Sequence, residues 1–117
     1  MSFIDIIPEE KFVRYKYDGF LTYTIYTSSR TLTYKCETAR ENVKTISYIH
    51  TIDPNEDLCI KYIFLSEKPN WSVLVIYTHQ QTLYFEISNL DNAYYPCNVF
   101  LEQTLNDEKK ILGFTTI

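Results

Sequence analysis

Apolar and polar side chains alternate along most of this 117-residue chain. The clearest case is residues 20–27, where Leu21, Tyr23 and Ile25 are separated by two threonines. Residues two apart lie on the same face of a β-strand, so this alternation predicts a strand with one apolar face. Tyrosine and β-branched residues also suit a pleated, half-buried surface. The pattern therefore predicts antiparallel β-structure.

The N-terminal segment predicts a hairpin that leads into this strand. Residues 11–17 show the same alternation, and the side chains expected on one face are Val13, Tyr15 and Tyr17. Asp18-Gly19 follows directly, and these residue types tolerate the positive φ angles of a tight type I′ turn. A third strand is expected over residues 31–36, with one face formed by Leu32, Tyr34 and Cys36. The three strands are expected to form a meander with one apolar face.

The middle of the chain predicts four further strands, over residues 43–52, 58–65, 71–78 and 82–88. Two of them, 58–65 and 71–78, are apolar on both faces. A strand of that kind is typical of a sheet that is covered on both sides. We therefore expect a second sheet, a helix or a partner molecule to lie over these two strands.

The C-terminal segment leaves two alternatives open. Residues 99–110 fit either a strand or a helix, because their apolar positions match neither period clearly, and we favour the helix. Residues 111–117 favour a strand, because Phe114-Thr115-Thr116-Ile117 is poor helix material. The total is about seven to nine short strands. This total predicts an all-β fold, or a β-rich fold with one short helix, arranged as an antiparallel sandwich or barrel.

Length and composition limit the classes of protein that the chain can form. A chain of this length is expected to form one domain, residues 1–117. Only 2 residues are glycine, which removes most glycine-rich loops that hold nucleotide phosphates. The formal net charge of −4 disfavours nucleic-acid binding, which needs a concentrated basic surface. The longest apolar run, residues 73–77, is too short to span a bilayer, so we expect no membrane partner.

The cysteines and the N-terminus predict a location. Three cysteines at wide spacing are an odd number, which predicts thiols rather than disulfides. The first residues also lack the basic and apolar regions of a secretory signal. Thiols persist in reducing compartments, so we expect an intracellular protein, cytoplasmic or nuclear.

Catalytic chemistry has one weak candidate, the thiol of Cys97. It follows Pro96 at the start of an element, where a thiol can be accessible and reactive. Its base would have to be His50 or His79, since the chain has only 2 histidines. So few histidines, without a Cys-x-x-Cys pair, predict no metal site, and we expect no cofactor. A thiol-dependent enzyme that uses Cys97 is therefore an alternative, and a non-catalytic protein is favoured.

Aromatic residues are the most distinctive part of the composition, with 11 tyrosines, 7 phenylalanines and 1 tryptophan. Tyrosine and tryptophan combine a large contact area with a polar tip and anchor many protein interfaces. The candidates at loop boundaries are Trp71, Tyr94 and Tyr95. We therefore expect a protein-binding module or small subunit, an adaptor that acts through an aromatic-rich sheet surface and can also form a homodimer. A closed barrel around a small apolar ligand is a second alternative.

Overall fold

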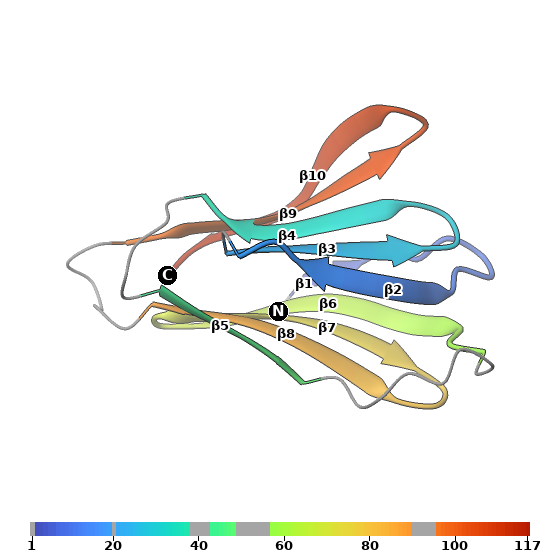
Figure 1. Cartoon of the computed structure of the whole chain (residues 1–117), viewed down its shortest axis with the longest axis horizontal. Helices are drawn as coiled ribbons and strands as arrows, with labels where there is room; N and C mark the ends of the chain where they lie inside the picture. The colour runs from blue at the N-terminus through green and yellow to red at the C-terminus, as the bar shows by residue number, and fades with distance from the viewer. Residues whose placement is uncertain (1, 20, 38–42, 49–56, 90–95) are drawn as a thin grey trace.

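Two antiparallel sheets of five strands each face one another in the computed structural model (Figure 1). The structure describes residues 2–19, 21–37, 43–48, 57–89 and 96–117, and over 43–48 it describes the backbone alone. Within these ranges every regular element is a strand. The predicted all-β, antiparallel fold is therefore confirmed, and its form is a sandwich of two open sheets.

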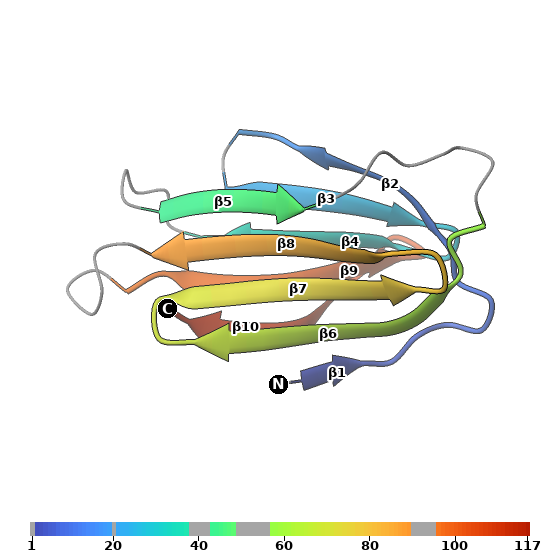
Figure 2. The same cartoon turned by 90° about the horizontal axis from the view of Figure 1, so that it is seen from below.

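Each sheet combines segments that are distant in the sequence. The first sheet has the order β1-β6-β7-β8-β5, with strands β1 (Ser2–Ile4), β6 (Ile60–Lys68), β7 (Trp71–Thr78), β8 (Thr82–Asn89) and β5 (Val43–Tyr48). The second sheet has the order β10-β9-β4-β3-β2, with strands β10 (Glu108–Thr116), β9 (Asn98–Leu105), β4 (Thr31–Cys36), β3 (Thr22–Thr27) and β2 (Phe12–Tyr17). Figure 2 shows the first sheet from its outer side, with β1 and β5 at its two edges.

The inner faces of the two sheets share one hydrophobic core. On the second sheet, the side chains predicted to face inward from the strands over residues 20–27 and 31–36 are buried, namely Leu21, Tyr23, Ile25, Leu32, Tyr34 and Cys36, whereas on β2 the predicted inward residues Val13 and Tyr17 are exposed. The first sheet contributes mainly Ile63, Leu74, Ile76, Leu83, Phe85 and Ile87. The rings of Tyr23 and Phe85 lie 5.2 Å apart and join the two layers. Full burial of one such side chain contributes about 1.5–3 kcal/mol, so this core is the main source of stability.

One polar contact crosses the core. The hydroxyl of Tyr34 on β4 lies 2.6 Å from the Oγ of Ser72 on β7. Burial raises the pKa of Tyr34 well above its ordinary value, and the hydrogen bond with Ser72 opposes this rise only in part. The phenol therefore stays protonated and keeps its hydrogen bond. A satisfied polar pair of this kind specifies how the two sheets align.

The C-terminal segment is a hairpin, so the helix predicted within residues 98–111 is wrong. β9 pairs with β4 on one side and with β10 on the other, and its backbone groups are used in the sheet. Leu105 pairs with Glu108 across a two-residue turn, in which Asn106 and Asp107 have φ angles of 52° and 63°. Two consecutive positive φ angles are typical of a type I′ turn, which Asn and Asp tolerate. The predicted C-terminal strand is present as part of β10.

The loop of the N-terminal hairpin is wider than predicted. β3 begins at Thr22, and the backbone N–H of Asp18 donates to the carbonyl oxygen of Thr22 at 3.2 Å. Gly19, with a φ angle of 83°, lies inside this loop and supplies one of its left-handed positions. The tight two-residue turn at Asp18-Gly19 is therefore wrong, although the glycine has the conformational role expected of it.

A β-bulge also corrects the predicted face of β2. The pairing of β2 with β3 shifts by one residue between Phe12 and Arg14. Phe12 therefore turns into the core, whereas Val13 is exposed and does not share a face with Tyr15. A bulge adds one residue to a strand and so interrupts the alternation on which the prediction depended.

The prediction that two strands are covered on both faces is wrong for β6, and it is wrong for β7 at Tyr77, which is 43% exposed on the outer side of the sheet. Elsewhere in β7, consecutive residues such as Val75 and Ile76 are both buried. In β6, a register shift after Ile60 is followed by Tyr62, which is 56% exposed on the outer side of the sheet. The apolar outer face of β6 therefore belongs to a surface that is open to solvent.

Candidate functional site

Aromatic side chains form two rows across the outer side of the first sheet, which faces the reader in Figure 2. The first row runs over β1, β6, β7 and β8 at the paired positions Phe3, Phe64, Val75 and Tyr84. The second row runs over β6, β7 and β8 at the paired positions Tyr62, Tyr77 and Thr82. Paired residues of antiparallel strands point to the same side of a sheet, so the rows are continuous. We call these seven residues the aromatic face.

Four rings of the aromatic face are open to solvent. Their exposed fractions are 67% for Phe3, 56% for Tyr62, 43% for Tyr77 and 41% for Tyr84. Val75 is buried among them, because its side chain is shorter than those of its neighbours. The seven residues line a shallow hollow of about 650 Å³. None of the seven is charged, although 22% of the residues in the chain are.

The rings of the aromatic face pack against one another at steep angles. The ring planes of Phe3 and Tyr62 are inclined by 68°, with their centroids 6.3 Å apart. Phe3 and Phe64 are inclined by 51°, and Tyr62 and Tyr77 by 39°. Aromatic pairs in such arrangements contribute about 0.5–1.5 kcal/mol beyond their buried area. The surface is therefore ridged, and it lacks the flat platform on which a sugar or a base stacks.

The outer side of the second sheet has a different chemistry. The paired positions across β3, β4 and β9 include the polar residues Thr24, Thr33 and Glu102. The Nζ of Lys35 lies 4.9 Å from the ring centroid of Phe100 and covers it with a charge. Phe114 on β10, which pairs with Phe100, is 62% exposed. Phe114 thus matches the rings of the aromatic face in exposure but lies on the opposite side of the sandwich.

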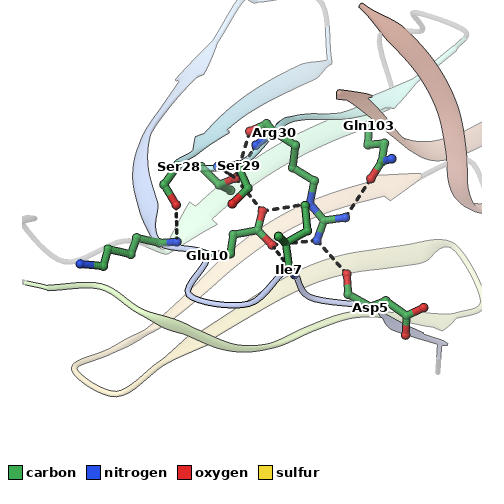
Figure 3. Close-up of polar contacts among 9 residues, drawn as sticks. Asp5, Ile7, Glu10, Ser28, Ser29, Arg30 and Gln103 are labelled. Atoms are coloured by element: carbon green, nitrogen blue, oxygen red, sulfur yellow. Dashed lines mark hydrogen bonds and ion pairs between the residues drawn. The ribbon is translucent and has the colours of Figure 1, made fainter. Parts of the chain in front are cut away.

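A second hollow, of about 380 Å³, lies between the segment after β1 and the β9–β10 hairpin. Arg30, just before β4, forms part of its wall, and Figure 3 shows its polar contacts with Glu10, Asp5 and Gln103. The guanidinium donates from Nε to Glu10 Oε2 and from Nη2 to Glu10 Oε1, both at 2.9 Å. Nη2 also donates to the carbonyl oxygen of Asp5 at 2.8 Å, and Nη1 donates to Gln103 Oε1 at 2.9 Å. The cation is therefore bound on several sides by the protein itself.

The Glu10 carboxylate is satisfied in the same way. It accepts hydrogen bonds from the Ile7 backbone N–H at 3.2 Å and from Thr27 Oγ1 at 2.6 Å, in addition to those from Arg30. The pair joins the crossover between β1 and β2 to the start of β4 and to β9. Because Arg30 and Glu10 neutralise each other, they form a structural network at the wall of this hollow, and the aromatic face is the better candidate for binding.

The predicted binding residues are only partly placed by the structure. Trp71 is half-buried at the start of β7, with Lys68 Nζ 5.7 Å from its ring centroid, and it does not line the hollow of the aromatic face. Tyr94 and Tyr95 lie outside the described residues. Sequence analysis missed Tyr62, Tyr77 and Tyr84 because they lie inside strands. The sequence feature that could have identified these tyrosines is that β6 and β7 are apolar on both faces.

The structure also places the thiol candidate. Cys97 is fully buried, and its backbone N–H and carbonyl oxygen are both paired with Ile117, at 2.7 and 2.8 Å. A catalytic thiol has to be accessible to its substrate, so this position does not favour thiol catalysis. Of its two possible bases, His79 is exposed at the β7–β8 turn and His50 lies outside the described residues. Among the residues that are described, no His, Cys, Asp and Glu side chains form a group of three that could hold a metal ion.

Comparisons of this chain with family models, with curated proteins and with solved structures find no match. The described part of the chain contains no helix that is long and apolar enough to cross a membrane. The class of protein is therefore defined by the fold, an all-β sandwich, and by the aromatic face on one of its sheets.

Proposed function

We propose that this protein is a non-catalytic binding module whose aromatic face binds the surface of another protein molecule. The observation that carries the proposal is the aromatic face itself, with four exposed rings around an uncharged hollow. The core of a protein interface is typically rich in tyrosine and phenylalanine and poor in charge. The aromatic face has this composition, whereas the outer side of the second sheet carries threonines and charged residues.

The size of the aromatic face supports the proposal. Aromatic side chains bury about 150–250 Å² each, so four rings at their exposed fractions present roughly 400 Å² of surface. The largest apolar patches of monomeric proteins measure about 300–600 Å² and are often functional. At about 25 cal/mol per Å², covering 400 Å² releases about 10 kcal/mol before the cost of association is subtracted. A surface of this size is therefore sufficient as the core of a specific interface.

The shape of the hollow favours a protein over a small molecule. The inclined rings offer no flat stacking surface, and the hollow is shallow and open along the sheet. Small-molecule sites bury most of their ligand in a cleft or cavity. The space between the sheets, where a barrel would hold an apolar ligand, is occupied by the side chains of the core.

Site-specific photo-cross-linking tests the proposal. The variants Tyr62→p-benzoylphenylalanine and Phe114→p-benzoylphenylalanine place the same reactive group at positions of similar exposure on opposite sides of the sandwich. In cells of the native host, we expect protein adducts from position 62 and few or none from position 114. No adduct at position 62, or equal yields at both positions, would contradict the proposal.

A further inference from the structure

We infer that the partner of the aromatic face is a second copy of this chain, in a twofold dimer whose first sheets pack with their outer sides together. This inference rests on the proposed function and adds the identity of the partner. It is carried by the shape, the charge and the area of the aromatic face.

The shape of the aromatic face meets the requirement of a twofold interface. In such an interface the same patch occurs on both subunits, so it has to contain both a projecting part and the recess that receives it. Phe3 and Tyr62 project at the β1–β6 side, with more than half of each side chain exposed. Val75 forms the low floor of the hollow beside them. A second copy, turned by 180°, can place its projecting rings over the floor of the first.

The spacing of packed sheets agrees with this arrangement. Two sheets that pack face to face lie about 10 Å apart, with the side chains of the two faces interleaved between them. The first sheet already packs in this way against the second sheet on its inner side. Its outer side offers the inclined rings of Tyr62 and Tyr77, at 39°, which can interleave with rings of another face.

The charge of the aromatic face favours a partner with an equally uncharged surface. A charged partner would lose its hydration there without gaining a counter-ion, because none of the seven residues is charged. The chain as a whole carries a net charge of −4, so two copies repel each other at long range. The aromatic face is the region where two acidic molecules can touch without placing like charges in contact.

The area of the aromatic face is also sufficient for a dimer. Two copies together contribute roughly 800 Å² of ring surface, from the exposed fractions of the four rings. Stable interfaces bury about 1,200–2,000 Å² in total, of which the apolar core is one part and the polar rim is the rest. The rings therefore provide the core, and the flanking residues of β6, β7 and β8 provide the rim.

Sedimentation velocity of the purified full chain tests the dimer directly. We compare the unmodified protein with Tyr62→Glu, which adds a charge to the aromatic face, and with Phe114→Glu, which adds one at matched exposure on the second sheet. We expect a dimer over about 1–100 µM protein, and about 100-fold weaker dimerisation for Tyr62→Glu, since each dimer contains two altered sites and each costs about tenfold. Phe114→Glu is expected to dimerise as the unmodified protein does.

Three results would overturn the inference: a monomer at every concentration, a dimer that Tyr62→Glu leaves intact, and a dimer that both substitutions weaken equally. Circular dichroism checks that each variant is folded, and Tyr84→Glu replaces Tyr62→Glu if that variant does not fold. A monomeric protein that still forms adducts from position 62 with a different protein would refute the dimer and leave the proposed function standing. A monomer with no such adducts would refute both.

Discussion

At the scale of single residues, the most constrained contact is the ion pair of Glu10 and Arg30. Both side chains are almost completely buried, and Nε of Arg30 lies 2.9 Å from Oε2 of Glu10. Removing two charges from water is costly, and their attraction repays the cost only if the remaining hydrogen-bonding groups are satisfied. Asp5, Thr27 and Gln103 supply these hydrogen bonds. The pair therefore fixes the crossover between the sheets, and its loss would leave a buried charge.

We expect Glu10→Gln to lower the free energy of unfolding by about 3 kcal/mol, because it leaves the buried Arg30 without a counter-ion. Urea denaturation followed by circular dichroism measures this change. The control is Asp57→Asn, which breaks the exposed pair of Asp57 and Lys11 and is expected to cost less than about 1 kcal/mol. Equal losses for the two variants would show that the buried pair has no special role.

Sequence analysis could not predict this pair or the exposure of the aromatic face. Arg30 is 20 residues from Glu10 and 73 residues from Gln103, so no local pattern connects them. Tyr62 lies in a strand that is apolar on both faces, and this pattern marks a second apolar surface without showing whether that surface is covered. Exposure of a tyrosine depends on how distant strands pack, and the hydrophobic periodicity of one strand carries no information about that packing.

At the scale of elements, the contact of β10 with β6 closes one side of the sandwich. Gly113 lies where the register of β10 shifts, and a β-carbon at this position would overlap the Cδ1 methyl group of Leu65 on β6. Two residues further along, Thr115 Oγ1 donates to a carboxylate oxygen of Glu67. The glycine thus makes room for the Leu65 side chain, and its φ angle is not the reason for its presence here.

We expect Gly113→Ala to destabilise the fold by about 1–2 kcal/mol, since Leu65 must move from its place against the core. Leu65→Ala alone also destabilises, but it removes the methyl group that the new β-carbon would meet. The double variant should therefore be more stable than the sum of the two single changes predicts. Thermal or urea denaturation of the four proteins measures the coupling, and strictly additive losses would refute the contact.

Elements whose partners are adjacent in sequence were the easiest to predict. The β3–β4 hairpin and strand β8 follow from the alternation, and strand β7 follows from its apolar run. β9 was harder, because it pairs with β4 over a long connection, and Gln103 and Thr104 interrupt its apolar positions. Asn106-Asp107 is a recognisable turn sequence between β9 and β10. The prediction of a helix over these residues left this turn out.

At the scale of the whole molecule, the two outer faces of the sandwich are unequal. Both sheets share one core, but the exposed apolar side chains of the first sheet lie together around one hollow, whereas Ile111 and Phe114 of the second sheet lie on a face with threonines and charged residues. A protein that needed only to fold would gain little from three exposed tyrosines and a phenylalanine around a hollow. The asymmetry supports the proposal that the first sheet buries this second surface against a partner.

Hydroxyl-radical footprinting with mass spectrometry tests this claim most directly, by comparing dilute purified protein with the same protein in cells of its native host. The account predicts that Phe3, Tyr62, Tyr77 and Tyr84 react readily in the dilute protein and are protected in the cell, while Phe114 reacts equally in both. Equal reactivity of the aromatic face in both conditions, or protection centred on Phe114, would contradict it.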